Sequence, residues 1–506
     1  MKKILALVLC LVIVMTFGLS VAGLKIVPVK SISLDKSSLT LNVGKTYNLK
    51  ATLAPTTTTQ KFLLYSTSDK NIASVDAKGK ITAIGLGKAV ITVTSTSNKK
   101  VLAKCNITVS QVVITFEHQD TEKPERASFY EKVAAKYSKL HPGVKIQITK
   151  STFSAAQTAI LTAISAGKPF DIIGQGPGNT KIWLEKNAIM EVTKYLDANN
   201  GEWKNTFRDG IYEALKYSDG KIYCIPQNID AAPLNYNMDI FFKKEHVSPA
   251  KTKEEFYAIC DKFKADGYIP FQLHGSMKDD LLNVFTLQFA ARDKITPFDI
   301  VEGRAKFTDP WFKDGLTLLK DMYDRGYLPK NFWTIGGTDG RMAYATGKMP
   351  QKFGYYWDVD THKDMGMPYD IQGVASMPDF TGVKGLKPYK IMGISGFMVS
   401  SQTKNADTAL DFLKFLTNDD NQDDLAYKHF GRYPNGMPVV NKSVELSGYA
   451  MQYMKDIATG MGTPYGFYNI SVKSQEVIDR YIPLLMEGKM TVDQVAIEFD
   501  KLRTNP

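Results

Sequence analysis

Polar side chains interrupt an otherwise apolar stretch at residues 220–241, which reads GKIYCIPQNIDAAPLNYNMDIF. Both ends of the stretch have the pattern of a buried β-strand, whereas Gln227, Asn228 and Asp230 lie in the middle among prolines and alanines. Amide and carboxylate groups at such a place could hydrogen-bond the hydroxyl groups of a bound molecule. The alternative is a surface loop between two strands. The stretch by itself leaves both interpretations open.

Residues with the spacing of a catalytic or metal site are absent from the sequence. The six histidines are dispersed without an HExxH pair, and no CxxC occurs. GISGF (393–397) lacks the spacing of a GxSxG nucleophile, and GQGPGNTK (174–181) lacks that of a phosphate-binding loop. The pair Asp279-Asp280 is more typical of a solvated helix end than of glycosidase carboxylates. We therefore expect no catalytic residues, no metal ligands and no cofactor.

Aromatic residues beside small or polar ones recur in the second half of the chain. The string FGYYWDVD places Tyr355, Tyr356 and Trp357 beside Asp358, and NFWTIGG (331–337) shows a weaker version of the pattern. Sugar rings have apolar C–H faces that stack on aromatic rings, while their hydroxyls need charged or amide partners. Core packing is the alternative for each aromatic residue. Trp357 is the best candidate for a ligand contact, because glycine and acidic residues surround it.

The first 22 residues are expected to be a secretory signal peptide. Lys2 and Lys3 precede an apolar run over residues 4–17, and small residues at 20–22 precede Gly23 as at a cleavage site. A membrane anchor is the alternative, but the run is short for a spanning helix. We expect an exported, extracellular protein that is soluble or associated with the cell surface or wall.

Three cysteines follow this segment: Cys105, Cys224 and Cys260. An odd number in an exported protein argues against a disulfide framework, so buried thiols are expected, with a Cys224–Cys260 bridge as an open alternative. Cys10 lies inside the apolar segment, where Leu9 replaces the small residue that a lipoprotein signal requires. Retention at the membrane through a lipid is therefore not predicted.

Nearly all the positive charge of the chain lies in residues 24–110. Thirteen lysines and three aspartates, with no arginine or glutamate, give this segment a charge of +10, against +11 for the whole chain. Such charge could attract an anionic cell-wall polymer. The lysines are scattered along the segment, however, which favours a solvated surface. Nucleic acid is a poor candidate partner because the protein is expected to be exported.

The same segment has the pattern of a small all-β sandwich. LTLNV (39–43) and AVITVTS (89–95) alternate or are β-branched, and residues 75–85 carry turn residues between short strands. KSISLDKSSLTLNVGKTYNLKATLAP, STSDKNIASVDAKGKITAIGLGKAVITV and CNITV resemble a bacterial immunoglobulin-like domain of group 2 over nearly all of 28–110. The resemblance implies an extracellular spacer or adhesive module.

From residue 111 onwards, strands and helices alternate. Strands are expected at 112–116, 144–148 and 169–174, and helices at 129–140 and 155–167. This order is typical of a doubly wound α/β layer. Further amphipathic helices are expected at 251–267 and 312–326.

Residues 111–506 resemble extracellular solute-binding proteins of family 1, the maltose-binding-protein-like sugar-binding components of ABC importers. Six landmarks occur in order: VVITFEHQ, FYEKVAAKYSKLHPGVKIQI, AGKPFDIIGQG, GKIYCIPQNIDAAPLNYNMDIF, YATGKMPQKFGYYW and GISGFMVSSQTKNADTALDFLKFLTNDDNQ. The resemblance implies a two-lobed α/β periplasmic-binding-protein-like fold of type II. Lobe one would hold about 111–228 and 395–440, and lobe two about 232–390 and 441–506. The lobes would close on a ligand between them.

The resemblance also implies ligand contacts in both lobes and in the strand that crosses between them. Gln175 stands where the family has a cleft tryptophan, which argues against a maltodextrin ligand. The implied contacts are Glu117, His118, Gln119, Gln175, Asn179, Asn228, Asp230, His274, Tyr356, Trp357, Ser395 and Gly396.

Together these implications describe a protein without enzymatic activity. It would capture a carbohydrate, expected to be an oligosaccharide, and deliver it to the transmembrane subunits of an ABC permease. The alternative is a cell-wall-associated interaction or adhesion protein that uses its lysine-rich module and takes a non-sugar ligand between the lobes. A glycoside hydrolase is the third hypothesis.

Overall fold

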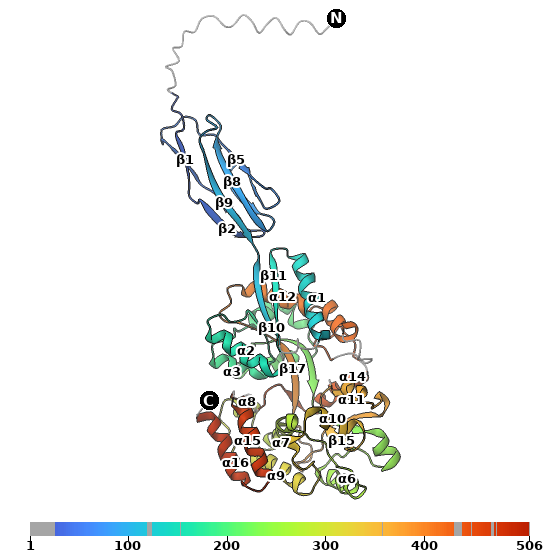
Figure 1. Cartoon of the computed structure of the whole chain (residues 1–506). Coiled ribbons are helices and arrows are strands. Elements are labelled where there is room, and N and C mark those ends of the chain that lie inside the picture. Colours follow the sequence, from blue (N-terminus) through green and yellow to red (C-terminus); the bar gives the residue numbers. More distant parts are fainter. Residues whose placement is uncertain are drawn as a thin grey trace, which may run out of the picture. The chain divides into compact units, whose positions relative to one another are not determined.

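The computed structural model describes residues 26–118, 124–151, 153–356, 358–429, 438–446, 448–466, 470–471 and 473–504 (Figure 1). The predicted signal peptide, Gln119 and Trp357 lie outside these residues. The chain divides into two compact units. One holds the residues up to Val112 together with His141–Lys145, and the other holds Val113–Leu140 and Ile146–Pro506. Among the residues described, no helix has the length and hydropathy needed to cross a membrane.

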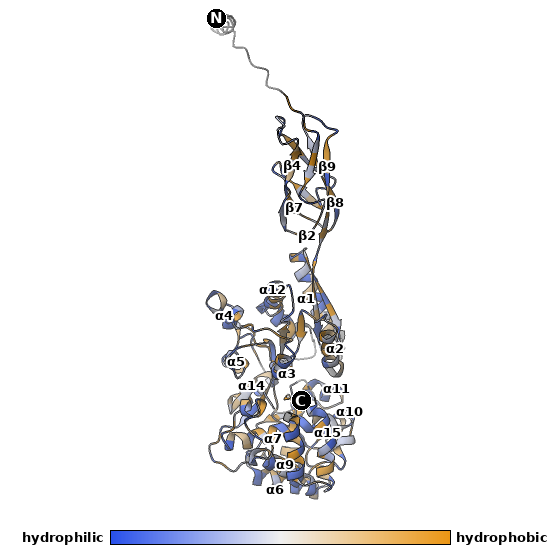
Figure 2. Cartoon of the chain, turned by 90° about the vertical axis from the view of Figure 1, so that its left-hand side faces the viewer, coloured by the Kyte–Doolittle hydropathy of each residue, from blue (hydrophilic) through white to orange (hydrophobic). Residues whose placement is uncertain are grey.

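The first unit is the all-β sandwich that the sequence predicts. Its strands alternate between buried and more exposed residues, as a sheet with one packed face requires. Ile91, Val93, Cys105 and Ile107 lie in its core, and Figure 2 shows hydrophobic and hydrophilic residues along the same strands. One sheet has the order β2-β9-β8-β5 and two smaller ones the orders β3-β7-β6 and β1-β4. The strands are β1 (Ser31–Leu34), β2 (Ser38–Asn42), β3 (Thr46–Asn48), β4 (Ala51–Ala54), β5 (Leu63–Thr67), β6 (Ala73–Val75), β7 (Lys80–Ala83), β8 (Gly87–Ser95) and β9 (Leu102–Ser110).

The second unit contains a larger sheet with the order β11-β10-β12-β17-β13, in which β18 also pairs with β17. β10 and β12 are parallel, whereas β17 is antiparallel to both β12 and β13. Phe116 anchors α1 and α12 to the sheet through edge-on ring contacts with Tyr130 and Phe412. We call this sheet and the helices that cover it lobe one. The elements of lobe one are β10 (Val112–His118), α1 (Pro124–Leu140), β11 (Val144–Lys150), α2 (Phe153–Ser165), β12 (Ile172–Gly174), α3 (Thr180–Glu185), α4 (Thr193–Gly201), α5 (Ile211–Leu215), β13 (Ile225–Ala231), β17 (Tyr389–Val399), α12 (Ala406–Leu416) and α13 (Asp419–Asp423). β18 (Met461–Thr463) pairs with the first residues of β17, at the end of that strand nearer lobe two.

A second sheet, β15-β14-β16, is the centre of lobe two, and both of its pairings are antiparallel. Thr252 caps α6 by accepting the amide of Glu255, and Thr296 and Asp299 form a capping box on α8. α7 is buried along most of its length and packs against α9. The elements are β14 (Leu234–Asn237), α6 (Lys253–Ala265), α7 (Lys278–Arg292), α8 (Pro297–Val301), α9 (Pro310–Asp324), α10 (Gly337–Ala345), β15 (Gln351–Phe353), α11 (Asp358–Asp364), β16 (Gln372–Ala375), α14 (Gly448–Ala458), α15 (Ser474–Met486) and α16 (Val492–Thr504).

Two adjacent strands connect the lobes. β13 lies in the sheet of lobe one and leads through Ala232 and Pro233 into β14 of lobe two. β17 begins beside β18 and ends in lobe one, where Val399 pairs with Ile172. The polar middle of residues 220–241 is therefore strand and not a surface loop. Gln227 lies at an irregularity in the pairing of β13 with β17 and is buried.

The cysteines Cys105, Cys224 and Cys260 are all free and buried. The alternative of a Cys224–Cys260 disulfide is therefore not realised in the structure. Burial raises the pKa of both of these thiols, so they remain protonated and act as small apolar side chains.

Candidate ligand-binding site

Asp230 lies near the end of β13 and fixes the backbone of two segments. Its Oδ1 accepts hydrogen bonds from the amide of Ala231 at 2.8 Å and from the amide of Tyr356 at 2.8 Å. The side chain is half-buried, and Gly393 of β17 lies opposite it. The carboxylate therefore ties the crossing strand to the aromatic segment that follows β15.

Three other predicted residues lie on the same pair of strands. Asn228 pairs with Ser395, and both are half-buried. Gly396 is buried, and a Cβ atom at this position would lie 2.3 Å from the carbonyl oxygen of Ile225. The structure thus brings Asn228, Asp230 and Ser395 together, whereas Gly396 allows close packing of β17 on β13.

Gln175 and Asn179 lie in the loop after β12 and are joined to each other. The Asn179 amide donates to Oε1 of Gln175 at 2.7 Å. The loop passes so close to β17 that a Cβ atom on Gly176 would lie 2.2 Å from the carbonyl oxygen of Ile394. Both amides are therefore held beside the crossing strand.

His118, at the end of β10, takes part in a buried chain of hydrogen bonds. Its ring packs on Tyr130 with the centroids 4.3 Å apart, and Nε2 lies 2.9 Å from the Tyr130 hydroxyl. That hydroxyl donates to Oε1 of Gln227 at 2.7 Å. Because a phenol has one proton to donate, His118 is the donor to Tyr130 and carries its proton on Nε2. His118 thereby connects the first strand to the crossing strand.

Glu117 precedes His118 on β10, so its side chain lies on the other face of the strand, away from these hydrogen bonds. It is completely buried. Within the described part of the chain, neither carboxylate oxygen has a hydrogen-bond partner in good geometry, although Ser151 and the amide of Gly174 are its polar neighbours. Burial raises the pKa of this carboxyl to about 7, and the two polar neighbours oppose the shift only partly.

The segment after β15 is held by several anchors in addition to Asp230. The Asn235 amide donates to the carbonyl oxygen of Gly354 at 3.1 Å. Tyr356 is buried, with its ring edge-on to Tyr453 at 5.5 Å. Tyr355 is half-buried, and its hydroxyl donates to Oδ1 of Asp280 at 3.0 Å. Of these two tyrosines, Tyr355 is the more accessible residue.

Asp280 belongs to the first turn of α7 and was not among the predicted contacts. Burial raises the pKa of its carboxyl well above the usual range, and the neighbouring Asp279 adds to this effect. Both aspartates are half-buried, so the prediction of a solvated helix end is wrong. The sequence offered one signal for this site, because it showed an acidic pair and a tyrosine beside the predicted Trp357.

A buried ion cluster lies beneath the aromatic segment. Asp358 is fully buried and forms ion pairs with Lys352, also fully buried, and with Arg341 at 2.9 Å. Burial alone would raise the pKa of Asp358, but the cations Lys352 and Arg341 outweigh it and lower the pKa to about 2. Asp358 is therefore ionised and holds the start of α11.

His274 lies beside this cluster in the interior of lobe two. Its Nδ1 is 2.9 Å from the Ser276 hydroxyl, and Nε2 has no hydrogen-bond partner among the described residues. Burial lowers the pKa of His274 to about 3, with a further contribution from Lys352 and Arg341. The ring is therefore neutral, and it supports α10, where it contacts Gly340.

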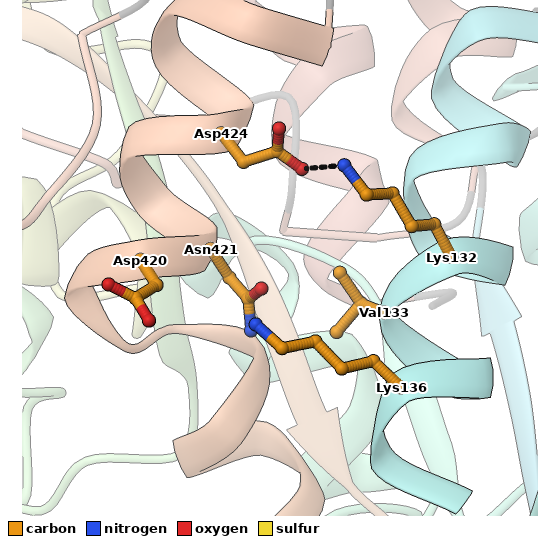
Figure 3. Close-up of a pocket in the computed structure, with 6 residues that line it drawn as sticks. All are labelled: Lys132, Val133, Lys136, Asp420, Asn421 and Asp424. Carbon is orange, nitrogen blue, oxygen red and sulfur yellow. Dashed lines mark hydrogen bonds and ion pairs between the residues drawn. The ribbon is translucent and has the colours of Figure 1, made fainter. Parts of the chain in front are cut away.

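A surface pocket lies elsewhere on lobe one. It has a volume of about 200 Å³ and is lined by Lys132, Val133 and Lys136 of α1 and by three residues of the 419–424 region (Figure 3). An ion pair of 2.8 Å joins Lys132 to Asp424 across it. None of the predicted ligand contacts lines this pocket. No group of His, Cys, Asp or Glu suited to a metal ion is found in the described part of the chain.

Residues 120–423 match the family of bacterial extracellular solute-binding proteins, and residues 28–105 match the bacterial Ig-like domain of group 2. The first match covers more than half of the chain. The chain therefore belongs to the bacterial extracellular solute-binding proteins and carries an N-terminal Ig-like domain, as the sequence predicts.

Several known proteins are similar to the chain. The galactooligosaccharide-binding protein of Bacillus subtilis is 24% identical over 315 residues, which cover 59% of this chain and 68% of that protein. An uncharacterized ABC transporter extracellular-binding protein of Pyrococcus horikoshii is 24% identical over 324 residues, or 61% of this chain and 70% of that protein. A solved chitin oligosaccharide binding protein has a TM-score of 0.65 at 23% identity, over 78% of this chain and 98% of that chain. This structural match confirms the two-lobed fold.

Other relatives share only a short region. An uncharacterized protein of Clostridium acetobutylicum is 39% identical over 82 residues, 16% of this chain, and the kappa-carrageenase of Pseudoalteromonas carrageenovora is 38% identical over 84 residues, 17% of this chain. The chain spans about a fifth of the length of each of these two relatives.

Proposed function

We propose that this protein is the carbohydrate-binding component of an ABC importer. The observation that carries the proposal is the half-buried pair Tyr355–Asp280. The next residue, Tyr356, donates its backbone amide to Asp230 of the crossing strand, which fixes this segment beside that strand. An aromatic ring beside a carboxyl group suits a sugar, because the ring can stack on the C–H face of the sugar and the carboxyl group can hydrogen-bond one of its hydroxyls. Membership of the solute-binding family supports the same function.

The ligand would lie against the crossing strands, with polar contacts from both lobes. Lobe one offers Gln175, Asn179 and Ser395, and the strand itself offers Asn228. Of the other predicted contacts, Gln119 and Trp357 stay predictions. We place the lobe boundaries as the sequence suggests, near residues 228–232 and 390–395, because β13 and β17 pass between the sheets there.

An oligosaccharide is the ligand that these contacts favour. Gln175 and Asn179 belong to lobe one, whereas the ring of Tyr355 belongs to lobe two. A ligand long enough to contact both lobes would stabilise the state in which the lobes are closed on it. The name of the Bacillus subtilis relative supports a galactose-containing oligosaccharide. Gln175, in place of an aromatic residue, supports a ligand other than a maltodextrin.

Binding without turnover is part of the proposal. Asp230 is engaged with two backbone amides, Asp358 with two cations, and Glu117 is completely buried. A glycosidase needs two carboxyl groups placed across the scissile bond. The protein would be extracellular after export by its signal peptide and would pass the intact sugar to the transmembrane subunits of a permease.

Calorimetry with a panel of mono- and oligosaccharides tests this function. The expected result is saturable binding of an oligosaccharide, with no new products when the mixture is later analysed by chromatography. Binding of an amino acid or a peptide, with no sugar bound, would contradict the carbohydrate assignment. Release of shorter sugars would contradict the absence of catalysis.

The charge of the Ig-like domain supports a second candidate function, retention at the cell envelope through an anionic wall polymer. The domain carries +10 in residues 24–110, although its lysines are scattered over many turns. Co-sedimentation of the full chain with isolated cell walls tests this candidate. Retention that persists in high salt would contradict an electrostatic mechanism.

A further inference from the structure

Four large apolar side chains are exposed at one end of the Ig-like domain. Ile26, Phe62, Leu64 and Leu102 are 68%, 81%, 61% and 45% exposed. Single exposed apolar residues are common on protein surfaces, whereas a group of them indicates an interaction site. We name this group the apolar tip.

Strand register places the members of the apolar tip close together. Leu64 of β5 and Leu102 of β9 are both partners of Thr94 on β8, so the three side chains form one row on the outer face of the sheet. Phe62 precedes Leu64 by two residues and therefore points to the same face. Its carbonyl oxygen accepts the amide of Thr96 at 3.2 Å, which fixes it beside the turn between β8 and β9.

The first described residues enter the domain at this end. The amide of Val27 donates to the Thr59 hydroxyl at 3.1 Å, and the Thr59 amide donates to the Val27 carbonyl at 3.2 Å. Ile26 therefore adjoins the loop that leads to Phe62. Since β9 runs from Leu102 to Ser110, the chain leaves the domain at the opposite end.

Positive charge lies beside the apolar tip. Lys61, Lys99, Lys100 and Lys104 are all exposed there, and Lys104 follows Leu102 on the same face of β9. Neither the loops 55–62 and 96–101 nor the outward positions of β2, β5, β8 and β9 contain a carboxylate. Among the described residues of the domain, the lysines of the tip therefore have no carboxylate counter-charge nearby, although the lysines of the whole domain are scattered.

We propose that the apolar tip docks onto a membrane surface that contains anionic lipid. Two contributions hold peripheral proteins on membranes: apolar side chains enter the interface, and lysines beside them attract anionic headgroups. A soluble polyanion would satisfy the lysines but would leave Phe62, Leu64 and Leu102 in water. Docking at this end of the domain would hold the protein at the membrane through the side chains of the domain itself.

This inference is independent of the sugar-binding proposal, and vesicles test it directly. The chain from Gly23 onwards is mixed with vesicles of phosphatidylcholine, with or without phosphatidylglycerol, and bound protein is measured by sedimentation across a salt series. Binding is expected only with phosphatidylglycerol and is expected to weaken with added salt. Lys99→Glu with Lys100→Glu should weaken it about ten-fold or more. Phe62→Ser with Leu102→Ser should weaken it at every salt concentration.

Matched variants at the other end of the domain are the controls. Lys70→Glu with Lys88→Glu gives the same change in net charge, and Leu86→Ser removes a comparably exposed apolar residue. These variants should bind vesicles like the unchanged chain. No binding to either vesicle would overturn the proposal, and so would equal losses in the tip and control variants. A third outcome is that the protein binds soluble polyglutamate but not vesicles, and that Phe62→Ser does not change this binding. That outcome would overturn the membrane proposal and assign the lysines to a soluble polyanion.

Discussion

Asp230 accepts the backbone amide of Tyr356 at 2.8 Å, although 126 residues separate them in the chain. One residue lies in the strand that crosses between the lobes, and the other lies in the aromatic segment of lobe two. A change in the path of the crossing strand therefore moves the tyrosine segment with it. The hydrogen bond couples the connection between the lobes to the position of the candidate ligand contacts.

Replacement of Asp230 separates this positioning role from a direct ligand contact. Asp230→Ala leaves the amides of Ala231 and Tyr356 without their acceptor, so the free energy of unfolding should fall by about 1–3 kcal/mol. Sugar affinity should fall as well, because the tyrosine segment loses its anchor. Asp230→Asn keeps one oxygen acceptor and should recover most of both losses. Urea unfolding and calorimetry measure the two quantities.

The control for Asp230 is Asp379→Ala. Asp379 accepts the amide and the hydroxyl of Thr381 at 2.8 and 2.6 Å, so its loss also frees local donors. This variant should lose some stability and keep its sugar affinity. If Asp230→Asn binds sugar as weakly as Asp230→Ala while remaining stable, the carboxylate contacts the ligand itself.

The buried ion pair Lys352–Asp358 gives a second prediction. Lys352→Met should lower the free energy of unfolding by about 3–5 kcal/mol, because Asp358 is left charged in the interior with Arg341 as its remaining cation. Adding Asp358→Asn removes the unpaired charge, so the double variant should be more stable than the sum of the single changes predicts. Urea unfolding of the four proteins measures the coupling. Additive losses would mean that the two side chains act independently.

The fold was predictable because its signals are local or strongly patterned. Alternation along residues 89–95 indicates a half-buried strand, and the strand-helix order after residue 111 indicates an α/β layer. The crossing strand was harder to predict. Its polar middle fitted a loop equally well until the resemblance placed Asn228 and Asp230 between two lobes.

The site was only partly predictable, because burial depends on contacts distant in the chain. Tyr355 and Tyr356 are neighbours, and the sequence favoured Tyr356. The structure buries Tyr356 against Tyr453 and leaves Tyr355 half-buried. The backbone on either side of Tyr355 is fixed, because Asn235 binds the carbonyl oxygen of Gly354 and Asp230 binds the amide of Tyr356. The residue types in the string FGYYWDVD carry no information about that orientation.

Tyr355 gives a third prediction, which concerns affinity. Tyr355→Phe removes the hydrogen bond to Asp280 but keeps the ring, so sugar affinity should fall only about three- to ten-fold. Tyr355→Ala also removes the ring and should weaken binding about ten-fold further. Calorimetry with the bound oligosaccharide measures both. Tyr323→Phe is a control, because Tyr323 packs against Phe332 outside this segment. Unchanged affinity in Tyr355→Ala would remove Tyr355 from the site.

Glu117 gives a prediction about pH. Burial raises the pKa of its carboxyl from 4.5 to about 7, so the folded protein holds a proton that the unfolded chain releases. The contribution of Glu117 to the free energy of unfolding is therefore fully present below pH 4.5, and it is lost as the pH rises through 7, for a total of about 3 kcal/mol. Glu117→Gln should remove this dependence, whereas Glu131→Gln, at an exposed position, should keep it. Urea unfolding between pH 5 and pH 8 measures the difference between the three proteins. The same slope in all of them would show that Glu117 is already ionised in the folded state.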